Sequence, residues 1–195
     1  MDVRCLGGFG LIKKLLFALL LCAASSSFAA TVLPMVLDEI VDSSAVAFQG
    51  ICTGNRTERD PLTNLVVTYT TFDVKEVIKG NVQKTHVIKQ IGGVMPSGEA
   101  SYLVHGIPKF AVGEEYVLFL AGVSSAGFSS PIGLSQGKFS IEQGDSGKMV
   151  SNGRDMRELT AKMPQADSLA IKEGSRKIGL DDLKRLTRAR VENFK

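Results

Sequence analysis

Two apolar runs dominate the pattern of hydrophobic and polar positions along the chain. The first extends from Asn64 to Gly80 and the second from Gly113 to Gly122. Both are rich in β-branched and aromatic residues, which favour a pleated, half-buried surface. We therefore expect two long strands at the centre of a small sheet or barrel.

The apolar residues of the first run change sides along the strand. Val67 and Tyr69 share one parity, Phe72 and Val74 share the other, and Val77 returns to the first. A straight strand would therefore turn about half of them toward water, because side chains alternate between the two faces. We predict a bulge or strong coiling near Thr70–Thr71 and again near Lys75–Glu76. Long coiled strands of this kind are what a small barrel requires.

The second run is apolar at every position from Tyr116 to Ala121. This is typical of a strand that is covered on both faces or crosses a barrel interior. Further strands are expected at residues 45–53, 86–91, 138–142 and 148–151, and loops at residues 53–63 and 94–112.

Helical patterns flank this β-rich region. Apolar residues recur with helical spacing from Leu33 to Val41, with Pro34 in the first turn, and again from Leu180 to Phe194. Asp181 and Asp182 begin the second stripe and basic residues follow, an order that the helix dipole favours. The predicted fold class is mainly β with flanking helices: a small antiparallel barrel, closed or partly open, with a short N-terminal helix and a C-terminal helical tail.

The N-terminal region has the layout of an export signal. Lys13 and Lys14 precede an apolar core at residues 15–24, and small residues follow it up to a cleavage position after Ala29. The expected organisation is a signal peptide at residues 1–29, a barrel domain at 30–153, and a linker with a basic helix at 154–195. The protein is then exported, periplasmic or secreted. Lipidation at Cys22 is the alternative, although Leu rather than a small residue precedes this cysteine.

Removal of the signal leaves Cys52 as the one remaining cysteine, so no internal disulfide is expected. The core alone must then stabilise the domain. Residues 30–153 carry a net charge of −3 and residues 154–195 one of +4. Acidic residues interrupt the basic helix, so we expect no nucleic acid partner, and membrane contact through this helix is not favoured.

Four ordered features resemble a pattern found in uncharacterised exported bacterial proteins. They are residues 74–80, 92–93, 106–110 and 113–120. More distantly, they are similar to the netrin-like domain of tissue metalloproteinase inhibitors and complement proteins. That domain is a barrel of the oligonucleotide/oligosaccharide-binding (OB) type. The resemblance implies an OB-like barrel over about residues 33–152. Inhibitors of that family reach a catalytic zinc through an N-terminal cysteine, whereas the mature chain here begins at Ala30 or Thr31, and the family's disulfides are missing.

The chain contains no recognisable catalytic set. Gly144 to Gly147 reproduce four letters of a serine protease motif, but they are also ordinary residues of a tight hairpin loop. Cys52 is expected to pack as a small hydrophobic side chain. A hydrolase that pairs Cys52 or Ser146 with His86 or His105 is the alternative.

No metal or cofactor site is expected. The two histidines and the nearby glutamates lack the spacing of a zinc site. The glycines at 92, 93, 98, 106 and 113 do not open a helix, so turns are a better interpretation than a phosphate-binding loop. The glycosylation triplet at Asn55 is interpreted as an exposed polar turn.

The irregular segment 94–110 provides the candidate contact surface. It carries apolar residues at Met95, Tyr102, Leu103, Ile107 and Phe110. These residues either bind a partner or plug one end of the barrel. The sequence thus predicts an exported, non-enzymatic binding module whose partner is another exported protein. A second alternative is envelope assembly or maintenance through the basic C-terminal helix.

Overall fold

The computed structural model describes residues 33–96, 98, 101–145, 147–163, 169 and 171–193. Residues 33–195 form one compact unit. The predicted export signal and Cys22 lie outside the described residues. None of the described helices is long and apolar enough to span a membrane.

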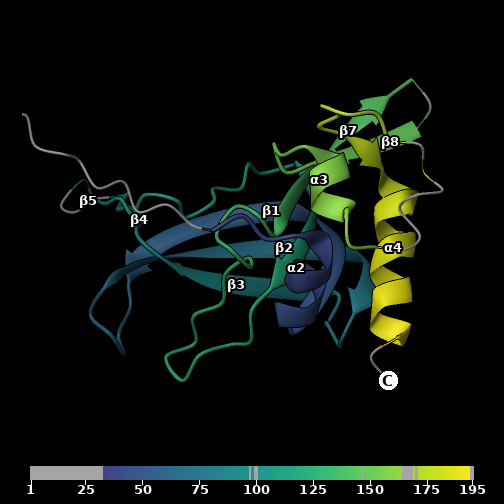
Figure 1. Ribbon diagram of the computed structural model, residues 1–195. Helices are drawn as coiled ribbons and strands as arrows, with labels where there is room; N and C mark the ends of the chain where they lie inside the picture. The colour runs from purple at the N-terminus through teal and green to yellow at the C-terminus, as the bar shows by residue number, and fades with distance from the viewer. Residues whose placement is uncertain are drawn as a thin grey trace, which may run out of the picture. The chain divides into compact units, whose positions relative to one another are not determined.

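Seven strands form one antiparallel sheet in the order β3-β2-β1-β6-β7-β8-β9 (Figure 1). They are β1 (Val46–Arg59), β2 (Val66–Lys79), β3 (Thr85–Ile91), β6 (Glu115–Leu120), β7 (Lys138–Gly144), β8 (Gly147–Ser151) and β9 (Ile178–Gly179). The described helices are α2 (Leu37–Ser43), α3 (Met156–Thr160) and α4 (Leu180–Glu192). The structure confirms the mainly β class with flanking helices, and the sheet is not closed into a barrel.

The two longest strands, β1 and β2, pair along their length with three shifts of register. Lys75 and Ile78 of β2, and Thr53 of β1, fall between the paired residues. The bulge predicted near Lys75 is therefore confirmed. The irregularity predicted near Thr70–Thr71 lies on the facing strand, at Thr53. Such bulges increase the local twist and bend the strands, which gives the curved ribbons of Figure 1.

Strand β1 also continues to Arg59, where the sequence predicted a loop from residue 53 onwards. Asn55 lies within the strand, opposite Thr70, and not in the exposed turn that was predicted. Polar residues occupy this part of β1, which is why the hydrophobic pattern does not reveal it.

A short segment spans part of the gap between the β3 edge and the end of β6. The backbone N–H of Ser129 donates to the carbonyl of Lys89 over 3.1 Å, and the N–H of Ala121 donates to the carbonyl of Ser130 over 3.0 Å. An isolated bridge joins Leu120 to Pro131. The coiled strands thus enclose an interior even though the sheet itself stays open.

The sheet separates two apolar cores, and β6 contributes to both. Tyr116, Leu118 and Leu120 point to the inner core, formed with side chains of β1, β2 and β3. Val117 and Phe119 point to the outer core, formed with helices α2, α3 and α4. The prediction that this strand is covered on both faces is confirmed.

Aromatic side chains connect the inner core. The Phe110 ring lies 5.1 Å from Phe72 and 5.4 Å from Tyr116, in both cases edge to face. This arrangement is favourable for aromatic rings. Phe72 and Tyr116 therefore share one layer, as expected if the two apolar runs line a common interior.

The N-terminal helix starts later than the sequence predicted. Its N-cap is Val36, so Pro34 precedes the helix. The N–H of Met35 donates to Oε1 of Gln136, and Nε2 of Gln136 donates to the carbonyl of Leu33. These bonds hold residues 33–35 in place outside the helix.

The region after residue 153, predicted as a linker and a tail, is part of the same compact unit. Leu159 of α3 and Leu183 of α4 are fully buried, and β9 pairs with β8. Basic side chains of α4 bind acidic partners: Lys184 contacts Glu76 over 2.5 Å, Arg188 contacts the same carboxylate, and Arg190 contacts Asp42. The helix is therefore docked on the sheet.

Substitution Leu183→Ala should lower the free energy of unfolding by about 2–5 kcal/mol, because it opens a cavity in the outer core. Arg185→Ala on the exposed side of the same helix should change it by less than about 0.5 kcal/mol. Urea unfolding of the two variants measures both quantities. Equal, small effects would show that α4 does not pack as described.

Candidate binding site

The inner face of β2 and β3 changes from apolar to polar along the strands. Residues that are direct partners in the antiparallel pair lie side by side on one face. Thr70 pairs with Ile88, and two residues further along the strands, on the same face, Thr68 pairs with Gln90. The apolar core therefore gives way to a polar floor at this end of the sheet.

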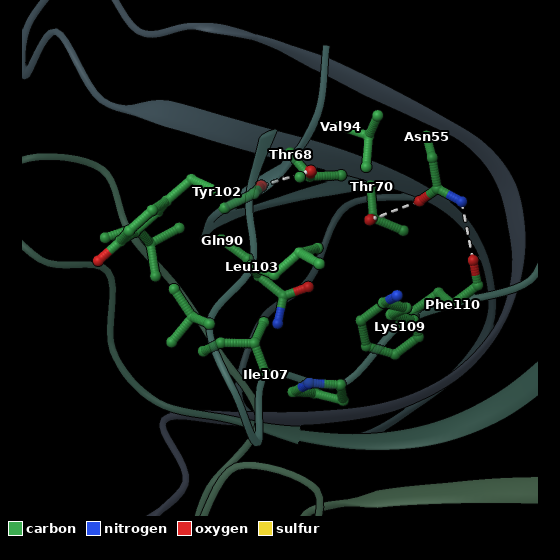
Figure 2. Close-up of a pocket in the computed structure, with 15 residues that line it drawn as sticks. Asn55, Thr68, Thr70, Gln90, Val94, Tyr102, Leu103, Ile107, Lys109 and Phe110 are labelled. Carbon is green, nitrogen blue, oxygen red and sulfur yellow. Dashed lines mark hydrogen bonds between the residues drawn. The ribbon is translucent and has the colours of Figure 1, made fainter. Parts of the chain in front are cut away.

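Hydrogen bonds organise this floor (Figure 2). The Thr70 hydroxyl donates to Oδ1 of Asn55 over 2.7 Å, and Nδ2 of Asn55 donates to the carbonyl of Phe110 over 2.8 Å. The Thr68 hydroxyl donates to the carbonyl of Gly92 over 2.7 Å. Asn55 thus ties β1 and β2 to residues 101–110, the covering segment.

A cavity of about 250 Å³ lies between this floor and the covering segment. Its lining residues come from β1, β2, β3, β4 (Gly93–Val94), β5 (Ser101–Tyr102) and the chain that follows β5. They are Asn55, Thr68, Thr70, Gln90, Ile91, Gly92, Gly93, Val94, Tyr102, Leu103, Val104, Ile107, Pro108, Lys109 and Phe110. In Figure 1, β4 and β5 lie at the opposite end of the long strands from α4.

Four of the five residues predicted for partner binding line this cavity: Tyr102, Leu103, Ile107 and Phe110. Met95 does not. The four differ in role, because Phe110 is only 6% exposed and belongs to the inner core, whereas Tyr102 is 50% and Leu103 63% exposed. Phe110 therefore plugs the interior, whereas Tyr102 and Leu103 are accessible at the mouth of the cavity.

Gln90 is a candidate site residue that the hydrophobic pattern of the sequence does not reveal. Its side chain is almost completely buried, and its Nε2 has no hydrogen-bond partner among the described residues. Figure 2 shows its amide group pointing into the space between Leu103 and Ile107. An unsatisfied buried donor costs about 1–3 kcal/mol. Its position in a strand pattern gives no sign of this, since the missing partner is a property of the folded chain.

A buried ion pair fixes β3 from the opposite face. Nζ of Lys89 lies 2.7 Å from Oδ1 of Asp60 and also donates to the carbonyl of Ala126. Asp60 accepts further bonds from Thr63 and from the Tyr69 hydroxyl. The Lys89 and Thr63 bonds hold the pKa of Asp60 well below its usual range. Lys89, which precedes Gln90 in the chain, therefore holds β3 in register.

A close backbone approach requires glycine at position 92. Gly92 has φ +92°, and a Cβ there would lie 2.5 Å from the carbonyl oxygen of Tyr102. The covering segment can therefore come this near to β3 only because residue 92 has no side chain.

Lys138 anchors the far end of the covering segment. Its ammonium group donates to the carbonyl of Lys109 over 2.6 Å and stands 5.1 Å from the Phe110 ring and 4.8 Å from the Tyr116 ring. Cation–π contacts of this kind are stabilising. Burial lowers the pKa of Lys138.

Of the residues proposed for a hydrolase, Cys52, His86 and His105 do not line this cavity. Cys52 is fully buried in the inner core, as expected of a hydrophobic side chain, and burial raises the pKa of its thiol. Phe72 of β2 pairs with Cys52 of β1 on one side and with His86 of β3 on the other. Two strand spacings therefore separate the backbones of Cys52 and His86, which is about 10 Å. Burial lowers the pKa of His86. His105 is exposed on the covering segment.

The protease-like motif forms the hairpin turn that was predicted, with Gly144 paired to Gly147. Ser146 lies outside the described residues. Within the described part of the chain, no three His, Cys, Asp or Glu side chains cluster in a way that could hold a metal ion.

Comparison with protein-family models gives no match, and no curated protein matches the chain in sequence. The functional interpretation therefore rests on the cavity itself, which combines apolar walls, a hydrogen-bonded floor and one unpartnered amide donor.

Replacing Gln90 by Met should raise the free energy of unfolding by about 1 kcal/mol, because the apolar side chain removes a buried donor that has no partner. Thr70→Val should lower it by about 1 kcal/mol, since it removes a hydroxyl that is bonded to Asn55. Urea unfolding at neutral pH compares the two variants. A loss of stability in the Gln90 variant as large as in the Thr70 variant would contradict the unpartnered state of the amide.

Acid should weaken the fold through Asp60. Its pKa in the folded protein lies below its ordinary value of 3.8, so the contribution of Asp60 to stability is complete above pH 3.8 and is lost as the pH falls toward the folded pKa. We expect the free energy of unfolding of the wild type to fall between about pH 5 and pH 2, and Asp60→Asn to be less stable at pH 7 but to depend less on pH over that range. Unfolding curves recorded at each pH test this, and equal slopes for the two proteins would refute it.

Proposed function

We propose that this protein is an exported, non-enzymatic binding module that holds another exported protein at the surface formed by Val94 and residues 101–110. One observation carries the proposal: three exposed apolar side chains surround the mouth of the cavity. Val94 is 61% exposed, Tyr102 50% and Leu103 63%. Single exposed apolar residues are ordinary, but a group of them around an apolar hollow is typical of an interaction site.

The surface is also held in shape before any partner arrives. Asn55 and Lys138 bind the backbone at Phe110 and Lys109, and Gly93 pairs with Tyr102 in the β4–β5 ladder. A pre-formed surface loses less conformational entropy on binding than a flexible one. This supports a role as a recognition surface.

Export is supported by the charged, apolar and small-residue regions in the first 29 residues. A partner must occupy the same compartment, so we propose an exported protein. The basic α4 helix is a less suitable contact surface, because Glu76 and Asp42 already pair with its Lys184, Arg188 and Arg190. The buried Cys52 likewise gives the hydrolase alternative no support.

Site-specific photocrosslinking tests the proposal. A photoreactive benzophenone amino acid placed at Leu103 of the full chain, in the cell that exports it, should give a protein adduct on irradiation. The matched control is Val123, which is 67% exposed but does not line the cavity. Adding Tyr102→Ser should reduce the adduct at position 103 at least about fivefold, because interface aromatic residues carry much of the binding energy, while the thermal melt stays unchanged. No adduct at 103, or the same adducts at 103 and 123, would overturn the proposal.

A further inference from the structure

We infer that the cavity receives one aromatic side chain of the partner protein, together with an adjacent carbonyl oxygen that accepts a hydrogen bond from Nε2 of Gln90. The inference rests on the proposed function, since it names the chemistry that the same surface recognises. Three properties of the cavity carry it: size, wall composition and unsatisfied hydrogen bonding.

The size fits a single ring. An engineered apolar cavity of about 150 Å³ holds one benzene molecule, and this cavity has about 250 Å³. Pockets for drug-sized ligands usually start near 300 Å³. One aromatic side chain with a few further atoms therefore fills the space.

The walls suit an aromatic ring. Leu103, Ile107 and Pro108 provide aliphatic surface, and the Phe110 ring offers an edge or a face for a further aromatic contact. Aromatic pairs of this kind add about 0.5–1.5 kcal/mol to the gain from burial when measured in proteins. Aromatic residues are also the ones most often found at the energetic centre of protein interfaces.

The hydrogen-bonding pattern requires an acceptor. The side chains of Asn55, Thr68 and Thr70 all have partners within the protein. The amide nitrogen of Gln90 is a donor only, and among the described residues nothing accepts from it. A group entering the cavity must therefore bring an oxygen acceptor to this point.

The charge of the lining disfavours a cationic group in the cavity. Among the cavity-lining residues, Lys109 is the one basic residue, and none is an aspartate or a glutamate. A cationic group would therefore meet no carboxylate there. The backbone carbonyl next to an aromatic residue is a neutral acceptor that every partner chain contains.

The test uses N-acetyl-phenylalanine amide as the ring with a carbonyl and toluene as the ring without one. Binding is followed by the NMR shifts of the Leu103 and Ile107 methyl groups. We expect the amide to shift both methyl groups in the wild-type protein and to bind at least tenfold more weakly to Gln90→Met, while toluene binds both proteins alike. The matched control Gln143→Met, at an exposed glutamine of β7, should behave as the wild type. No methyl shifts with the amide, or equal affinity for the wild type and the Gln90 variant, would overturn the inference.

Combining this titration with the crosslinking separates the two proposals. A Leu103 adduct that persists when the amide fails to bind through Gln90 supports the binding module and refutes the acceptor chemistry. Binding of the amide through Gln90 with no protein adduct supports the ring-and-carbonyl chemistry, assigns its source to a small molecule, and refutes the protein partner.

Discussion

Strand β6 must be shielded from water on both faces, and the rest of the domain is arranged around that requirement. Leu118 and Phe119 are neighbours in the chain, yet they are buried in different cores. Complete burial of such side chains is worth roughly 1.5–3 kcal/mol each, so neither cover is dispensable. Helices α2, α3 and α4 shield the outer face, and the coiled strands β1, β2 and β3 shield the inner face together with Phe110. The C-terminal helix is therefore structural, even though its charges suggest a tail.

The cavity forms where the inner cover changes character. The coiled strands extend beyond the last apolar residues that could fill their interior, so Thr68, Thr70 and Gln90 form the floor there. Hydrogen bonds satisfy the threonines, but the Gln90 amide keeps an unused donor. Sequences that fold well usually avoid such a local conflict except at functional sites. The same strand is held by the Asp60–Lys89 pair on its other face, which keeps the donor in place.

The features predictable from the sequence are those with a local pattern. Continuous apolar residues at 116–121 indicated burial on two faces, and the parity changes in β2 indicated the bulge near Lys75. Asn55 could not be placed, because its partners Thr70 and Phe110 are distant in sequence and polar residues conceal the strand. The sequence identified four of the residues that line the cavity but not Gln90, whose significance comes from a hydrogen bond that the fold leaves unmade.

The interior of the coiled sheet is filled at one end and hollow at the other, beneath residues 101–110. A crystal of the protein pressurised with xenon tests it most directly, because xenon enters accessible apolar cavities and can be located by its scattering. The account predicts a xenon atom between Leu103, Ile107 and Phe110. An interior free of xenon, with the Leu103 and Ile107 side chains packed against Gln90, would contradict it.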